Sequence, residues 1–149
     1  MKYLLILLLC LGFGSEKLEV IRCTSQEWAG GLRESGYGIN YELTLKTKAT
    51  SSQLSIDDLW VGDSRLKVRV IADPANLQSK TFAKGSQIVI KAGITYRPDA
   101  QGRIAEPVTD SIKKPFNFKG EGLLVYTYKG HKTYLKIAEF KKLEKIIYP

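Results

Sequence analysis

The stretch INYELTLKTK, residues 39–48, decides the fold, because its apolar and polar side chains alternate without a break. The apolar positions are Ile39, Tyr41, Leu43 and Leu45, and the polar positions are Asn40, Glu42, Thr44 and Lys46. A period of two residues is typical of a strand that covers a core with one face and meets water with the other. The stretch therefore predicts an antiparallel strand.

The same alternation recurs along most of the chain. RLKVRV (65–70) follows LWV (59–61) after a turn at 62–64, which predicts a hairpin. QIVIKAGITYRP (87–98) is rich in β-branched residues and predicts another strand. A second hairpin is predicted in residues 122–140, where Lys129 and Gly130 separate two apolar runs.

Helical periodicity is nearly absent from the chain. Only EFKKLEKIIYP, residues 139–149, fits a helical turn as well as it fits a terminal strand. The longer connections at 72–84 and 102–115 favour Greek-key crossings. We therefore predict an all-β fold: one antiparallel β-sandwich domain, broadly immunoglobulin-like, with about seven to nine strands.

The beginning of the chain predicts export. Lys2 precedes an apolar run at 3–11 and the small residues Gly12, Gly14 and Ser15, so we expect residues 1–14 to be a signal peptide and 15–149 to be the mature domain. The apolar run is too short to span a bilayer, and no transmembrane span is expected in the mature chain. The predicted location is periplasmic or extracellular. Lipid anchoring through Cys10 is the less favoured alternative, because Leu9 stands where such signals carry a small residue.

Removal of Cys10 with the signal peptide would leave Cys23 as the one cysteine of the mature chain. A single thiol cannot form an internal disulfide, so the domain must depend on its apolar core. We expect Cys23 to be a small buried hydrophobe and not a nucleophile, since a nucleophilic thiol needs a partnering base.

The segment GGLRESGYG, residues 30–38, raises the question of a phosphate-binding loop. Such a loop leads into a helix whose N–H groups meet the phosphate, whereas this one leads into the strand at 39–48. The glycines therefore predict a bend between an edge segment that carries Trp28 and the first long strand.

The candidate partner-binding residues lie around this bend and in the last hairpin. They are Trp28, Arg33, Tyr37, Tyr41 and Lys132. The first four are close in sequence and combine aromatic rings with a guanidinium group, which suits recognition at the mouth of a loop. Lys132 belongs to a lysine-rich hairpin that also carries several tyrosines.

No catalytic, cofactor or metal site is predicted. Asp57, Asp58 and Asp63 lack the ligand spacing of a calcium loop, and His131, the one histidine of the chain, falls at a hairpin tip. We therefore favour a non-enzymatic binding or interaction module. The alternative is a hydrolase that acts on envelope glycan with paired carboxylates, Asp57 or Asp63 with Glu121.

The charge of the chain narrows the choice of partners. A net charge of +8 and a pI near 9.5 attract anions. Export argues against nucleic acid as the partner, so none is expected. The predicted partners are another envelope protein, or an anionic glycan or lipid surface.

The motifs QEWAGG, GYGINYELTL and LWVGD, together with the closing KTYLKI and KIIYP, carry one resemblance. In this combination the chain resembles small exported proteins of Bacteroidetes-type bacteria, a group with no assigned activity. The resemblance implies export and a β fold, and it implies no functional residues.

Overall fold

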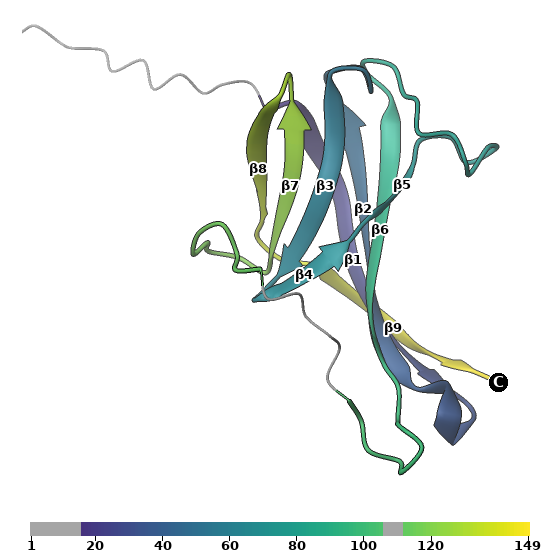
Figure 1. Ribbon diagram of the computed structural model, residues 1–149. Coiled ribbons are helices and arrows are strands. Elements are labelled where there is room, and N and C mark those ends of the chain that lie inside the picture. The colour runs from purple at the N-terminus through teal and green to yellow at the C-terminus, as the bar shows by residue number, and fades with distance from the viewer. Residues whose placement is uncertain (1–15, 106–111) are drawn as a thin grey trace, which may run out of the picture.

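The computed structural model describes residues 16–105 and 112–149, and these form a β-sandwich of two sheets (Figure 1). The strands are β1 (Leu18–Gly30), β2 (Tyr37–Thr47), β3 (Leu54–Val61), β4 (Ser64–Lys67), β5 (Arg69–Ile71), β6 (Gln87–Tyr96), β7 (Gly122–Tyr128), β8 (His131–Ile137) and β9 (Lys141–Tyr148). The large sheet has the order β5-β6-β2-β1-β9 and the small sheet the order β4-β3-β7-β8. The predicted all-β sandwich is confirmed, with nine strands in the described residues. The predicted signal peptide, including Cys10, lies outside them.

The alternation that predicted β2 also positions the core. Leu43 and Leu45 are fully buried, and their partners across the ladder, Ile90 and Ile88, are buried as well. The side chains that alternate with these leucines in β2, such as Glu42 and Lys46, lie on the outer face of the large sheet. The core therefore fills the space between the two sheets, as a period of two requires.

The two predicted hairpins are both present. β3 and β4 pair across Gly62, which has φ 59°. β7 and β8 pair across Lys129 and Gly130, with φ 47° and 79°. Positive φ at both central residues is the geometry of a tight hairpin turn, and Gly130 supplies it without steric cost.

The stretch RLKVRV departs from the prediction of a single strand. It divides into β4, in the small sheet, and β5, in the large sheet, with Val68 between them. The alternation of apolar residues continues through the break, because Leu66, Val68 and Val70 all pack against the one core. The chain crosses from one sheet to the other here and joins them along one side.

The C-terminal stretch is a strand and not a helical turn. β9 pairs in parallel with β1, so the sandwich is not entirely antiparallel. β1 pairs with β2 on one side and with β9 on the other, so the prediction that the segment with Trp28 is an edge segment is wrong. The two strands meet from opposite ends of the chain, a pairing that local sequence does not reveal.

The two long connections differ in kind. Residues 97–121 pass from β6 in the large sheet to β7 in the small sheet, which is the predicted crossing. The prediction of a crossing at 72–84 is wrong, because residues 72–86 join β5 to its neighbour β6 within one sheet.

A second apolar cluster covers the outer face of the small sheet. Trp60, Leu123 and Val125 are buried there, and Phe118 from the 97–121 connection packs on them. Phe116 from the same connection contacts the ring of Tyr134 edge to face, with centroids 5.0 Å apart. Trp60 is therefore buried, as expected, although it lies outside the space between the sheets.

The large sheet extends past the end of the small sheet (Figure 1). β9, the end of β1 and the start of β2 form this extension, and the bend at 31–36 closes it. No helix within residues 16–105 and 112–149 has the length and apolar character needed to cross a membrane.

Candidate ligand-binding site

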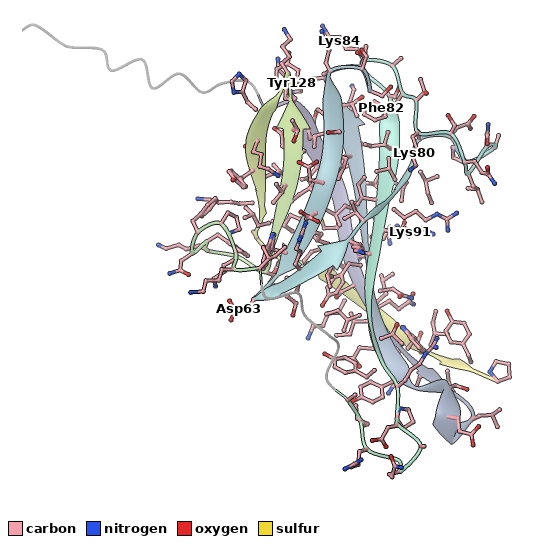
Figure 2. All side chains as sticks on the ribbon, viewed as in Figure 1. Asp63, Lys80, Phe82, Lys84, Lys91 and Tyr128 are labelled. Carbon is pink, nitrogen blue, oxygen red and sulfur yellow. The ribbon has the colours of Figure 1, made fainter. Side chains whose placement is uncertain are left out.

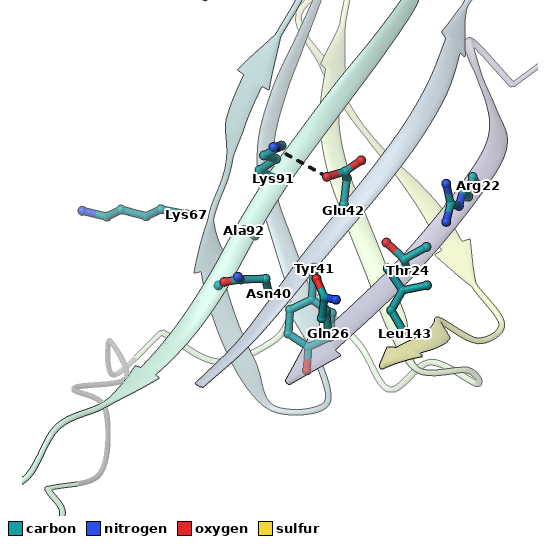
Figure 3. A pocket seen from close by; sticks show the side chains of 11 residues that line it. Arg22, Thr24, Gln26, Asn40, Tyr41, Glu42, Lys67, Lys91, Ala92 and Leu143 are labelled. Carbon is teal, nitrogen blue, oxygen red and sulfur yellow. Dashed lines mark ion pairs between the residues drawn. The ribbon is translucent and has the colours of Figure 1, made fainter. Parts of the chain in front are cut away.

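A polar hollow of about 520 Å³ lies on the outer face of the large sheet (Figure 3). Because side chains alternate between the two faces of a strand, every second side chain points outward here, and Tyr41 of β2 and Ala92 of β6 line the hollow between the outward residues. The outward side chains that line it are Arg22, Thr24 and Gln26 of β1, Asn40 and Glu42 of β2, Lys91 of β6, and Leu143 of β9. Lys67 of β4 lies at the rim, and its side chain extends away from the others (Figure 3).

Two local features form the floor of the hollow. Gly93 stands opposite Asn40 in the β2–β6 ladder, and a methyl group at Gly93 would lie 3.1 Å from Asn40 Oδ1. The missing side chain leaves room beside this amide. On the other side, Gln26 Nε2 donates a 2.9 Å hydrogen bond to the carbonyl oxygen of Glu144, at the point where the β1–β9 register shifts. Gln26 is thereby held in place.

The charge around the hollow is mainly positive. Lys91 Nζ lies 3.6 Å from Glu42 Oε2, and both side chains are about half exposed. Glu42 is the one carboxylate among the described lining residues. Arg69 of β5 stands directly opposite Lys91 in the β5–β6 ladder. Like charges in opposed positions are destabilising, so this part of the sheet favours an anion.

The side chains in the hollow offer two kinds of recognition. The amides of Gln26 and Asn40 each provide donors and an acceptor, and the hydroxyl of Thr24 provides both, so they suit ligand hydroxyl groups. Arg22 and Lys91 provide cationic donors, which bind carboxylate or sulfate through charge-assisted hydrogen bonds.

Trp28 extends the same face beyond the hollow. It lies two residues after Gln26 on β1 and stands opposite Gly38 of β2. A methyl group at Gly38 would lie 2.8 Å from Trp28 Nε1, so the indole ring covers the glycine backbone. The ring of Tyr148 meets Trp28 edge to face, with centroids 6.1 Å apart. Trp28 is therefore a partly buried aromatic wall of this face and not an exposed loop residue.

The structure separates Trp28 from the other residues predicted around the bend. Tyr37 and Tyr41 are odd-numbered residues of β2 and lie on the inner face, whereas Trp28 lies on the outer face. Tyr41 is buried against Phe140, and burial, with Tyr96 and Glu121 nearby, raises the pKa of its hydroxyl. Tyr37 stacks on Tyr96, with ring centroids 5.1 Å apart.

Arg33 and Lys132, the two charged candidates, lie in two other parts of the molecule. Arg33 begins a short 3-10 turn, Arg33–Ser35, in the bend. Lys132 is on β8 of the small sheet, where its ammonium lies 3.9 Å from Asp57 Oδ2. The five predicted residues therefore do not form one site: Trp28 lies on the outer face beyond the hollow, and Tyr41 is the one of the five that lines the hollow, from β2.

Sequence reasoning missed the hollow residues Arg22, Gln26 and Lys91. The polar face of β2 was visible as Asn40 and Glu42, but nothing local indicated which strands stand beside it. Strand neighbours depend on the whole topology. The hollow residues can be identified only when β6 and β1 are known to lie on either side of β2.

The carboxylates of the hydrolase alternative have separate partners. Asp57 accepts a 2.7 Å hydrogen bond from Thr127 Oγ1, and Glu121 accepts one of 2.8 Å from the N–H of Phe140. Asp57 and Glu121 are about four strand residues apart in the β3–β7 ladder, or about 13 Å at the usual rise per residue. Asp63 is 87% exposed and pairs with Lys114 at 2.6 Å. The structure does not bring Asp57 and Glu121 together as an acid–base pair.

Metal-ligating side chains do not gather in the described residues, where no group of three or more His, Cys, Asp or Glu is close enough to hold an ion. His131 is exposed at the start of β8, as its position in the hairpin predicted. Cys23 packs on the edge of the core, and burial raises the pKa of its thiol to about 11. The thiol is therefore protonated at neutral pH, as a packing residue would be.

Comparison with protein-family models, with curated proteins and with solved structures finds no match to this chain. The resemblance to small exported bacterial proteins stays a prediction.

Proposed function

We propose that this protein is a non-enzymatic binding module that holds an acidic glycan on the outer face of its large sheet. One observation carries the proposal: Arg69 stands opposite Lys91, and Arg22 lies across the same polar hollow, with Glu42 as the one carboxylate among its described lining residues. Glu42 offsets the charge of Lys91, and the remaining positive charge of Arg22 and Arg69 favours an anionic ligand.

The neutral groups in the hollow favour a sugar over a simple anion. Thr24, Gln26 and Asn40 line it beside the charged side chains (Figure 3). Their hydroxyl and amide groups match ligand hydroxyls that both donate and accept. Trp28 lies beyond them on the same face and offers the flat apolar surface of an indole. The predicted export would place the module where acidic envelope glycans occur.

Calorimetric titration tests the proposal with oligogalacturonate as the acidic probe and a dextran oligomer of similar length as the neutral probe. We expect the acidic probe to bind and the neutral probe to bind much more weakly. Arg22→Gln and Lys91→Gln should each lower the affinity by about tenfold, because each removes a charge-assisted hydrogen bond.

The matched control is Lys132→Gln, which removes a lysine from the small sheet. It should leave the affinity nearly unchanged. Equal loss in Lys132→Gln and Lys91→Gln would show that total charge, and not the hollow, attracts the glycan. Equal binding of the two probes would also contradict the proposal.

A further inference from the structure

A second cavity, of about 610 Å³, opens between the two sheets on the side where β3 faces β5. It lies beside the place where the chain crosses from β4 to β5 at Val68. Its apolar lining residues are Leu54, Ile56, Val68, Val70, Leu77 and Phe82. Its polar lining residues are Ser51, Ser55, Arg69, Gln78 and Lys80. We call this cavity the inter-sheet crevice. It shares no lining residue with the polar hollow.

One wall of the crevice is apolar and continuous with the core, and the remaining lining is polar. Leu54 and Phe82 are buried, and Ile56, Val68 and Val70 are partly buried and pack against the main cluster. The crevice is therefore an unfilled margin of the core that opens to solvent. Its volume falls within the range usual for small-ligand pockets, about 300 to 1,000 Å³.

The loop at 72–86 covers the crevice unevenly. Its second half is fastened to the sandwich, since Ser51 N–H donates to Phe82 O at 3.0 Å and Phe82 N–H donates to Ser51 Oγ at 3.1 Å. In its first half, the hydrogen bonds of Asp73, Asn76 and Ser79 run within the loop in the described structure. This half can move away from the crevice without breaking a bond to either sheet.

An exposed leucine stands at the mouth of the crevice. Leu77, in the first half of the loop, lines the opening and is 53% exposed. A leucine in this position loses exposed surface only if something apolar occupies the crevice beside it.

The charges at the mouth are all positive. Lys80 and Arg69 line the crevice, and none of its described lining residues is acidic. Lys80 has no ion-pair partner in the described part of the chain. Figure 2 places Lys80 and Phe82 on the stretch of loop above β5, with Lys84 farther along at the end of the sandwich.

We propose that the inter-sheet crevice binds a free medium- or long-chain fatty acid, with the alkyl chain between Val68, Val70 and Ile56 and the carboxylate at Lys80. A crevice with one apolar wall, cations at its mouth and no acidic residue in its described lining complements an amphipathic anion of this kind. The two cavities share no lining residue, and Arg69, which lies beside Lys91 and also lines the crevice, is the one cation named for both.

A chain-length series tests the apolar part. Octanoate, decanoate and dodecanoate are titrated into the whole protein by calorimetry, below the concentrations at which they form micelles. If the chain enters the crevice, each added methylene should raise the affinity by about three- to fourfold. An affinity that does not change with chain length would overturn the proposal, because it would show that only the carboxylate is bound.

A matched pair of charge reversals tests the position of the carboxylate. Lys80→Glu should weaken dodecanoate binding by about fivefold to tenfold. Lys84→Glu makes the same change of charge on the same loop, but outside the crevice, and should leave the affinity within about twofold. Both side chains are exposed, so neither variant should impair folding. Equal weakening in the two variants would contradict the proposal.

A filling variant and a lipid control complete the test. Val70→Phe narrows the crevice and should abolish dodecanoate binding, while circular dichroism checks that the fold is kept. If the variant is unfolded, the charge pair and the chain-length series decide. Vesicles of phosphatidylglycerol that bind as well as the free acid, with the same dependence on Lys80, would overturn the assignment in favour of a membrane surface. Lys91→Gln should leave dodecanoate binding unchanged while it weakens glycan binding.

Discussion

Gly38 and Trp28 show how one residue without a side chain shapes a sheet face. The indole ring lies flat over the backbone of Gly38, and the carbonyl oxygen of Ile94 approaches from the next strand. An aromatic ring that covers a glycine in the neighbouring strand restores the packing that the glycine lacks. The glycine-rich segment therefore includes a packing position as well as a bend.

Alanine at Gly38 should be costly. Its methyl group would overlap the carbonyl oxygen of Ile94 and crowd Trp28, so Gly38→Ala should lower the free energy of unfolding by about 2 kcal/mol or more. Gly93→Ala is the comparison, since the nearest atom there is the side-chain oxygen of Asn40, which can turn aside. Urea denaturation measures both. A similar loss in the two variants would contradict the packing argument.

Gly93→Ala also bears on the proposed glycan site. The added methyl group would occupy the floor of the polar hollow beside Asn40. We expect weaker binding of oligogalacturonate with little change in stability, as measured by calorimetry and urea denaturation. Unchanged affinity would show that the ligand does not reach the floor.

Cys23 should be an unreactive thiol in the folded protein. Burial raises its pKa from 9.0 to about 11, so the thiolate fraction at pH 8 is about a hundredfold lower than in the unfolded chain. Reaction with Ellman's reagent at pH 8 should be correspondingly slow until denaturant is added. The same shift stabilises the folded state fully below about pH 9, and this contribution is lost as the pH rises towards 11. Rapid labelling without denaturant would contradict this account.

At the scale of elements, the connection between β6 and β7 acts as a cover for the small sheet. Phe118 packs on Trp60, Leu123 and Val125, whereas Phe116 is more exposed and touches Tyr134. Burial of Trp60 therefore depends on the connection between β6 and β7, and this connection contacts the sheet through the ring of Phe118. Lys114, close to Phe118, adds an ion pair with Asp63 that ties the loop to the β3–β4 turn.

Phe118→Ala should uncover Trp60. We expect a loss of about 2 kcal/mol in the free energy of unfolding, less than for a fully buried phenylalanine because the ring is partly exposed. The tryptophan emission should move to longer wavelength as water reaches the indole ring. Phe116→Ala is the matched control and should change both measurements less. Identical spectra for the two variants would refute the role given to Phe118.

The same scale shows what the sequence could predict. The alternation in residues 39–48 was sufficient for β2, because one face of a strand must be apolar to cover a core. RLKVRV also alternates, yet nothing in the pattern marks Val68 as the point where the chain changes sheets. An apolar residue at that point satisfies the core from either sheet, so the pattern is the same on both sides of the break. Strand β9 was ambiguous because Phe140, Leu143 and Ile147 fit helical spacing, and its pairing with β1 decided the outcome.

The candidate site could be predicted less well than the fold. Four of the five predicted residues were chosen for closeness in sequence, but alternation sends Trp28 and Tyr37 to opposite faces once Trp28 is opposite Gly38. Which face a residue takes depends on register, and register is set by pairing between distant segments. That Trp28 lies on the outer face of the large sheet follows only from the register of the folded sheet.

At the scale of the whole molecule, the two proposed ligands should respond differently to salt. The glycan meets exposed charges on an open sheet, and such interactions are screened by ions. Raising sodium chloride from about 0.05 to about 0.5 M should weaken oligogalacturonate binding by at least tenfold. Dodecanoate, whose chain is buried, should lose much less. Titrations at several salt concentrations measure both, and an equal response would show that the two ligands share one electrostatic site.

The parallel pairing of β1 with β9 has a consequence for how the chain reaches its native state. Thr24 and Lys141 are neighbours in this ladder although more than a hundred residues separate them in sequence. Contacts of such long range close slowly and form after local hairpins such as β7–β8. Until β9 arrives, one edge of β1 offers unpaired N–H and C=O groups, which invite association with other chains. Refolding yield should therefore fall as protein concentration rises. Association through the edge of β1 should stop once β9 has paired with it.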